Sequence, residues 1–338
     1  MLFVGFFPLV FGCYSLEQAV YYNDLYNSRV SLEEAQNLEE FDEKTKAALA
    51  EIQKIAAFAK TQGLFVEDSY KHFIPYKNSA VSFLVQASQA DRFAAYKWWF
   101  PFAGEVPYLG FYNEPDRDSV ARSLESQGYD VYTAEAGAFS SLGWFEDPVF
   151  YSMTQRSTPR LVHLIFHELT HRTLWIQGSV RFNENLAEFI AEWLTPLYLE
   201  KYFPKKWEKM AKELKDYRQD KAVFKSWLAD LKGSLVDVYQ QEGLARDAKL
   251  SLKEEIIKKY TKGALKPTFA HYNFAGGEWN NARILSSGLY IPDLKPFEKA
   301  RACLESRTAG EFLIKLNGIA EEFDADDLTV LDLACRRV

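Results

Sequence analysis

The amino-acid sequence predicts an α+β fold, in which a small sheet packs on a helix and a mainly helical part completes the chain. Residues 73–144 contain short runs of alternating or aromatic side chains, which favour strands. Residues 158–192 have apolar side chains at helical spacing, and residues 199–262 are rich in Lys and Glu at the same spacing. With 338 residues, 48% of them hydrophobic, the chain can bury a large core.

The N-terminal segment resembles a targeting signal. The run MLFVGFFPLVFG carries no charge, has the length of a signal-peptide core and is too short to span a bilayer. Gly12-Cys13 resembles a bacterial lipobox, although Phe11 is bulkier than usual and no Lys or Arg precedes the run. We expect residues 1–13 to direct the chain to the bacterial cell envelope, with a periplasm-facing lipid anchor at Cys13. A soluble periplasmic protein, or a buried N-terminal helix, is the alternative.

Residues 14–338 are expected to form a single unit with two lobes, 14–157 and 158–338. The net charge is -7 and no basic stripe is present, so we expect no nucleic-acid partner. The three cysteines form no CxxC pair. Cys303 and Cys335 either pair in an oxidising compartment or stay as buried thiols, and their spacing does not decide between these.

The first lobe begins with a predicted helix. Ser31-x-x-Glu34 is a capping box, and the apolar spacing after it predicts one long amphipathic helix that ends near Gly63. Asn113 begins a second helix that Gly128 closes. Strands are expected at residues 80–85, 106–111 and 129–133, and an edge strand at residues 138–144.

The stretch that organises the second lobe contains His167-Glu168-x-x-His171, followed by Asn183-Glu184-x-x-Ala187-Glu188. Thr158-Pro159 suits a helix start, with Thr158 as cap, and Gly178 suits the break after it. The two His are four residues apart, so both imidazoles project from one face of that helix. The next helix carries the two Glu one turn apart, and Pro196 is expected to interrupt it.

Two imidazoles from one helix and a carboxylate from the next form a donor set that suits catalytic zinc, which keeps a fourth position open. Glu168 is placed to accept a proton from a water on the metal. His163 lies one turn before His167, but three successive turns of a straight helix cannot converge on a tetrahedral ion. We expect His163 to be a neighbour and not a ligand. The alternative is that these His are satisfied core groups.

HExxH followed by NExxA resembles the gluzincin metallopeptidases. LIFHELTHRTLWIQGSVRFNENLAEFIAE closely resembles the bacterial "predicted aminopeptidase" family of lipoprotein-like metallopeptidases. GCYSLEQAVYYNDL, FPFAGEVPYLGFY, GYDVYTAEAGAFSSLGWFEDP and NNARILSSGLY extend the likeness over most of the chain. The resemblance implies a gluzincin-like fold, one zinc per chain bound by His167, His171 and Glu184, and Glu168 as base. Glu188 is then free to hold the outer nitrogen of a ligand His.

The remaining C-terminal sequence predicts scaffold helices and a donor for the oxyanion of the reaction. Residues 199–262 are expected to form a solvated antiparallel helix pair without chemistry, with Ser251 as a helix cap, and residues 297–338 two closing helices. A peptidase needs a donor for the oxyanion, and Tyr290, Arg283 and His271 are the candidates, with Tyr290 as our choice. Each of them could instead cap a helix or join the lobes.

The function we expect is zinc-dependent hydrolysis of peptides or proteins, and the resemblance implies an aminopeptidase. The edge strand at residues 138–144 would then line the cleft and pair with the substrate backbone. No loop of the GAMEN type is present to bind a free amine, and Glu135 is the nearest acidic residue. An endopeptidase is therefore one alternative, and a non-catalytic envelope protein that retains a zinc site is another.

Overall fold

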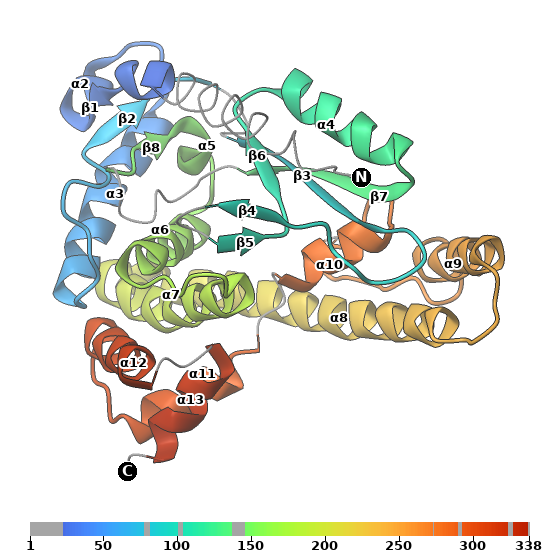
Figure 1. Cartoon of the computed structure of the whole chain (residues 1–338). Helices are drawn as coiled ribbons and strands as arrows, with labels where there is room; N and C mark the ends of the chain where they lie inside the picture. The colour runs from blue at the N-terminus through green and yellow to red at the C-terminus, as the bar shows by residue number, and fades with distance from the viewer. Residues whose placement is uncertain are drawn as a thin grey trace, which may run out of the picture.

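The computed structural model describes residues 23–77, 82–100, 104–136, 146–272, 274–289, 293–323 and 327–336. It has the mixed α+β character that the sequence predicts (Figure 1). Two central helices, α6 (Thr158–Thr173) and α7 (Val180–Tyr202), carry the HExxH motif and the downstream Glu residues. Because α6 begins at Thr158, the cap position belongs to Ser157 and not to Thr158.

Two helices replace the single long helix expected after Ser31. α2 (Leu32–Asn37) begins with the predicted capping box, since the Ser31 side chain and the Glu34 side chain bond each other's backbone N–H. α3 (Glu43–Thr61) begins anew at Asp42, whose side chain accepts from the Thr45 N–H. The chain breaks between the two helices because this second cap competes with helix continuation.

The strands of the described residues form three small sheets instead of the single sheet we expected. They are β1 (Val30–Ser31), β2 (His72–Ile74), β3 (Ser82–Gln89), β4 (Trp98–Phe100), β5 (Gly104–Val106), β6 (Leu109–Phe111), β7 (Tyr129–Ala136) and β8 (Val149–Phe150). The sheet orders are β1-β2-β8, β6-β3-β7 and β4-β5. The strand expected at 106–111 is split because Pro107 cannot donate to a ladder.

The β6-β3-β7 sheet is covered by α4 (Glu114–Ser126), and together they bury their own apolar cluster (Figure 1). As predicted, the Asn113 side chain caps α4 through the Asp116 N–H, and Gly128 follows its end. Gly128 has a φ of 81°, a left-handed conformation that suits glycine.

Helix α7 continues through Pro196, where we expected an interruption. A proline inside a helix costs about 3 kcal/mol. Leu194, Tyr198 and Leu199 on either side of it are completely buried, and each such side chain contributes about 1.5–3 kcal/mol. Burial on both sides of Pro196 therefore outweighs the lost hydrogen bond.

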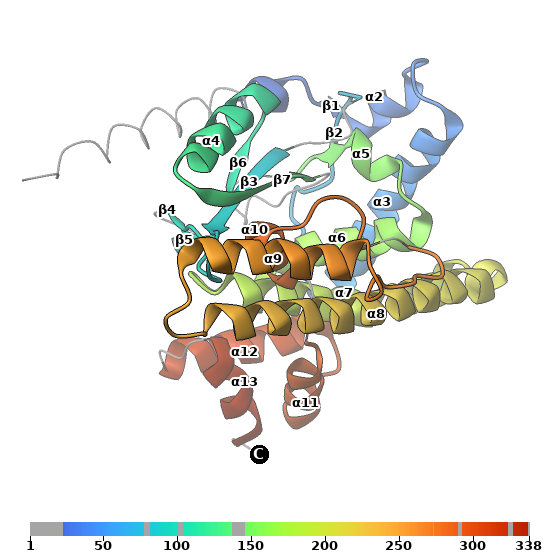
Figure 2. The ribbon, with the colours of Figure 1, turned by 90° about the vertical axis from the view of Figure 1, so that its right-hand side faces the viewer.

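Helices α8 (Trp207–Tyr239) and α9 (Arg246–Thr261) run side by side in opposite directions, which confirms the predicted helix pair (Figure 2). A short 3₁₀ turn, Pro204–Lys206, leads from α7 into α8. The prediction that Ser251 caps a helix was wrong. Ser251 lies inside α9, where its hydroxyl donates to the Asp247 carbonyl.

The C-terminal region contains α10 (Asn281–Leu289), α11 (Lys295–Cys303), α12 (Ala309–Phe323) and α13 (Asp327–Arg336). Three helices thus replace the two expected after residue 297, because Glu305 takes a left-handed φ of 48° and ends α11. A disulfide joins Cys303 of α11 to Cys335 of α13. Within the described ranges, no helix is both long and apolar enough to cross a bilayer.

Candidate metal centre

The turn between α6 and α7 sets the register of the two helices. The Asn183 side chain donates to the Ile176 carbonyl at 2.7 Å and accepts from the Ile176 N–H at 2.9 Å. Asn183 is only 1% exposed, so this two-bond clamp is shielded from water. Gly178 lies in the turn with a φ of 78°. As a result α7 returns along α6 and brings Glu184 opposite His167 and His171.

Donor atoms of three side chains converge between the helices. Nε2 of His167 lies 3.1 Å from Nε2 of His171 and 3.3 Å from Oε2 of Glu184. Nε2 of His171 lies 3.6 Å from Oε1 of Glu184. A tetrahedral zinc ion with ligands at about 2.0–2.1 Å holds them about 3.3 Å apart. The spacing and chemistry of this trio therefore fit a zinc ion.

The two rings of the trio differ in charge in the metal-free protein. Burial alone would lower the pKa of His167, but the Glu184 carboxylate outweighs it and raises that pKa to about 9. Burial lowers the pKa of His171 to about 4, so this ring stays neutral at pH 7. Its Nδ1 is buried with no hydrogen-bond partner among the described residues, so nothing there would compensate a charged ring. Neutral imidazole is the form that binds zinc, so His171 is already in the binding form, whereas His167 releases a proton when an ion binds.

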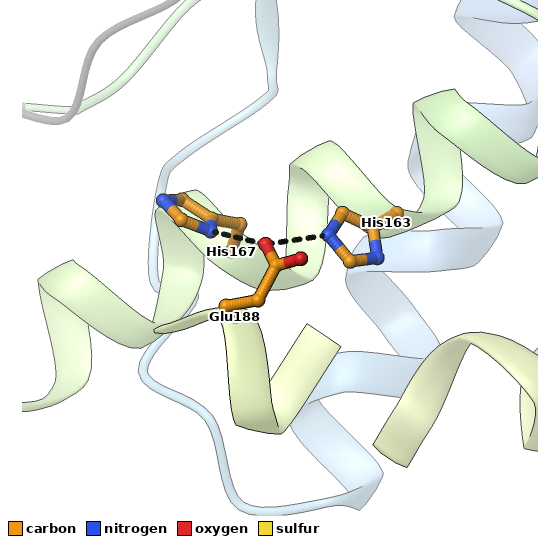
Figure 3. A group of neighbouring side chains, drawn as sticks. All are labelled: His163, His167 and Glu188. Carbon is orange, nitrogen blue, oxygen red and sulfur yellow. Dashed lines mark hydrogen bonds and ion pairs between the residues drawn. The ribbon is translucent and has the colours of Figure 1, made fainter. Parts of the chain in front are cut away.

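A second group lies behind His167 and is centred on Glu188 (Figure 3). Oε2 of Glu188 lies 3.1 Å from Nε2 of His163 and 3.8 Å from Nδ1 of His167. Its other oxygen accepts from the Lys221 ammonium at 2.5 Å. Burial alone would raise the pKa of Glu188, but His163 and Lys221 hold it well below its ordinary value.

The Glu188 group has enough donors for a metal, yet its charge is already balanced. The Lys221 ammonium neutralises one carboxylate oxygen, and a metal ion beside it would be repelled. We therefore regard Glu188 as a hydrogen-bonding partner of His163 and as an electrostatic partner of His167, and not as a metal ligand. Sequence reasoning missed Lys221, which follows Glu188 by 33 residues in a helix that we expected to be solvated scaffold. No local pattern marks it among the other lysines of α8.

Glu168 is the remaining carboxylate of the HExxH motif. Burial raises its pKa to about 7, and the positive charge of His167 opposes this rise. The negative charges of Glu184 and Asp147 add to it, whereas Arg156 lowers it. A carboxyl group whose pKa lies near neutrality can both accept and release a proton at pH 7.

The oxyanion candidates make other contacts. The Arg283 guanidinium donates to the carbonyls of Glu278 and Gly276 and packs over the Trp279 ring, so it holds its own loop. His271 is exposed, and its Nε2 lies 3.5 Å from a carboxylate oxygen of Asp216. The structure thus does not bring these two side chains into contact with the trio.

The other residues that the sequence singled out either belong to the β6-β3-β7 sheet or lie outside the described residues. Glu135 is an exposed residue of β7, opposite Phe83 of β3. Tyr290, Cys13 and the edge strand expected at 138–144 lie outside the described residues.

Comparison with known proteins gives one match. The model of the family described as "Putative aminopeptidase" matches residues 13–322. No curated protein and no solved structure matches the chain. Because the match covers most of the sequence, the chain belongs to the putative aminopeptidase family.

Proposed function

We propose that the chain is a zinc-dependent peptidase, with a gluzincin-like arrangement of its metal centre. The observation that carries the proposal is the mutual approach of Nε2 of His167, Nε2 of His171 and the two carboxylate oxygens of Glu184, each ring nitrogen lying 3.3–3.6 Å from one of these oxygens. These three side chains would hold the ion. A bound zinc ion supplies a Lewis acid that polarises the scissile carbonyl and makes water a nucleophile at neutral pH.

Glu168 moves the proton in this proposal. Its carboxylate accepts a proton from the attacking water and then gives it to the nitrogen of the departing amine. Burial raises the pKa of this carboxyl above its ordinary value, which suits a group that both accepts and releases a proton near neutral pH. The burial that raises this pKa also keeps bulk water from competing for the proton.

Glu188, His163 and Lys221 keep His167 in position. The carboxylate faces Nδ1 of His167 at 3.8 Å and is itself held by His163 and Lys221. An acceptor on this side favours the tautomer with the proton on Nδ1, which leaves Nε2 free to bind the ion. We assign Glu188 this orienting role and not that of a ligand.

Aminopeptidase activity is supported by the family to which the chain belongs. Endopeptidase activity is the alternative, because no described residue has been identified that would bind a free amine. For the oxyanion we retain Tyr290 as the proposed donor on the order of the sequence, since Arg283 is already bound to its own loop. Cleavage of a peptide library followed by mass spectrometry separates trimming from the amino end from internal cuts.

The test of the function is Glu168→Gln. The amide cannot accept the proton, so we expect full zinc content and a fall in kcat of about 10²–10⁴-fold. Metal analysis and cleavage of the peptide library measure the two effects. Glu192→Gln is the matched control, since Glu192 lies on α7 and pairs with Arg218, away from the trio.

Two results would contradict the proposal. Wild-type protein that binds zinc but cleaves nothing in the library would indicate the non-catalytic envelope protein instead. Full activity in Glu168→Gln would remove Glu168 from the proton transfer and leave the hydrolysis itself in place.

A further inference from the structure

Two arginines, Arg156 just before α6 and Arg160 in its first turn, have buried nitrogen atoms without a hydrogen-bond partner. Nε of Arg156 and Nη2 of Arg160 are both inaccessible to water, and neither has a hydrogen-bond partner in the described part of the chain. An unpaired guanidinium in a low-dielectric setting is costly, because it loses hydration and gains no hydrogen bond in return. Such atoms need a partner, and the fold does not supply one.

The carboxylates nearby are already engaged. Glu188 accepts from Lys221 at 2.5 Å, and Glu213 accepts from the Ser157 hydroxyl between the two arginines. Asp216 of α8 accepts from Lys212 at 2.5 Å. No described carboxylate forms an ion pair with Arg156 or Arg160. Apart from the longer-range attraction between Arg156 and Glu168, the described residues supply no counter-charge to the pair.

Aromatic rings hold one of the arginines in place. The Arg160 guanidinium carbon lies 4.4 Å from the centre of the Tyr217 ring and 4.5 Å from that of Tyr272. Ring contacts of this kind restrain the plane of the guanidinium, and Arg160 is only half-buried, so the N–H groups other than those of Nη2 lie at an edge that a ligand can reach. A planar anion such as a carboxylate matches that edge with two hydrogen bonds.

The two arginines also lie beside each other. Burial lowers the pKa of Arg156, and the adjacent charge of Arg160 lowers it further. Two like charges kept together without a counter-ion form a binding place for an anion.

The pair lies toward the N-terminal end of α6, on the helix that carries the proposed metal ligands His167 and His171. Arg160 precedes His167 by two turns on α6, which corresponds to about 10 Å along the helix. The charges of Arg156 and Glu168 attract each other, and each shifts the pKa of the other group. The pair therefore lies near the residue that we assign to proton transfer. An extended peptide advances about 3.3–3.6 Å per residue, so this separation equals about three residues of substrate.

The geometry points to a carboxylate-binding subsite formed by Arg156 and Arg160, which binds an anionic group of the substrate peptide beyond the cleaved bond. This inference rests on the proposed peptidase function and specifies its substrates. They are short peptides whose terminal carboxylate lies within about three residues of the scissile bond. An Asp or Glu side chain at the same distance presents the same chemistry. The subsite would give this peptidase a preference for small, free peptides.

The test is binding of tetraalanine to the zinc-loaded Glu168→Gln protein by calorimetry. A charge-assisted, two-bond contact is strong, so the free acid should bind about tenfold or more tighter than the amide. Arg160→Gln in the same background should abolish this difference. Arg122→Gln is the matched control, because Arg122 is an exposed residue of α4, and it should preserve the difference. A tetrapeptide amide with one Asp separates the side chain from the chain end as the source of the carboxylate.

Arg156→Gln is the second variant, chosen in case the loss of ring contacts unfolds Arg160→Gln. Nε of Arg156 is buried without a hydrogen-bond partner and Arg156 forms no ion pair with a described carboxylate, so the ligand-free variant should melt at the wild-type temperature or above it. A purely structural role would lower its Tm. The same variant should reduce the preference for the free acid.

Several outcomes overturn the inference. Equal affinity for acid and amide, no measurable binding of the acid at millimolar concentration, or a preference that survives both Arg→Gln changes would each do so. If wild type cleaves acid and amide equally, the subsite fails while the peptidase function stands. If no peptide is cleaved but the acid preference in binding persists, the function fails while the subsite stands.

Discussion

In the candidate metal centre, we assign different roles to residues of one type because their neighbours differ. Glu184 and Glu188 are one turn apart on α7, and both side chains are 12% exposed. Glu184 faces Nε2 of His167 and of His171, and among the described residues it forms an ion pair with these two rings alone. Glu188 instead accepts from the Lys221 ammonium. Charge balance, and not burial, therefore separates the proposed ligand from the orienting residue.

This difference predicts an order of zinc affinity. Glu184→Ala should lose most of the bound zinc, because it removes a ligand atom. Glu188→Ala should lower the affinity by about 10–100-fold, the usual effect of removing a partner of a ligand His. Competition with a chelator measures both variants, and Glu192→Ala on the same helix is the control. The reverse order would exchange the roles that we assign to the two residues.

At the scale of elements, α8 supports the centre through adjacent residues. Lys221 reaches toward Glu188, whereas Asp220 turns to the chain that follows α9. The Asp220 carboxylate accepts from the backbone N–H groups of Ala270, His271 and Tyr272 at 2.6–2.9 Å. This contact fixes the segment that carries Tyr272, and thereby one of the two rings against Arg160.

The Asp220 contact predicts a pH-dependent stability. Burial alone would raise the pKa of Asp220, but the three N–H donors outweigh it and hold the pKa below the ordinary value of 3.8. The carboxylate therefore stabilises the fold above pH 3.8, and this contribution disappears as the pH falls through the lower folded pKa.

Asp220→Asn should accordingly lower the urea midpoint at neutral pH, and the gap from wild type should narrow in acid. Urea unfolding at several pH values measures this gap. Asp237→Asn, an exposed position on the same helix, should have little effect at any pH. A gap that stays constant across the range would show that the carboxylate charge is not what the backbone N–H groups recognise.

At the scale of the whole molecule, α7 is held from two sides. One side faces α6 and carries the Glu residues of the centre. On the other side, Phe189 packs against Phe297 of α11 and Phe312 of α12, with ring centres 5.8 and 5.5 Å apart. The C-terminal helices thus support the metal centre from behind, as their place below α7 indicates (Figure 1).

We expect the protein to become less stable when the Cys303–Cys335 disulfide between α11 and α13 is removed. The bond closes a loop with a sequence separation of 32. Loop-closure entropy for that length is about 3–4 kcal/mol, so Cys335→Ser should lower the Tm by several degrees. Thermal unfolding with and without reductant measures it, and reductant should have no further effect on the variant. A wild-type Tm that stays unchanged when reductant is added would contradict a stabilising role of the disulfide.

A disulfide that persists in the protein isolated from cells would also support the export that we expect from the N-terminal sequence, because reducing compartments oppose such bonds.

The sequence by itself determined what depends on local spacing. The four-residue interval between His167 and His171 places both imidazoles on one face in any α-helix. The Ser31 capping box, the Asn113 cap and the antiparallel pair of α8 and α9 also follow from neighbouring residues. Local geometry, together with the family motif, was enough to indicate the metal centre and its candidate base.

Tertiary structure decided what depends on distant partners. Lys221 meets Glu188, Asn183 clamps Ile176, and Pro196 stays inside α7, because packing brings together groups that no short-range pattern connects. The division of the strands into three sheets is of the same kind. The two unpaired arginines at the start of α6 are visible only there as well, since the cost of an unpaired charge arises from burial. Burial belongs to the folded chain and not to the sequence of any one segment.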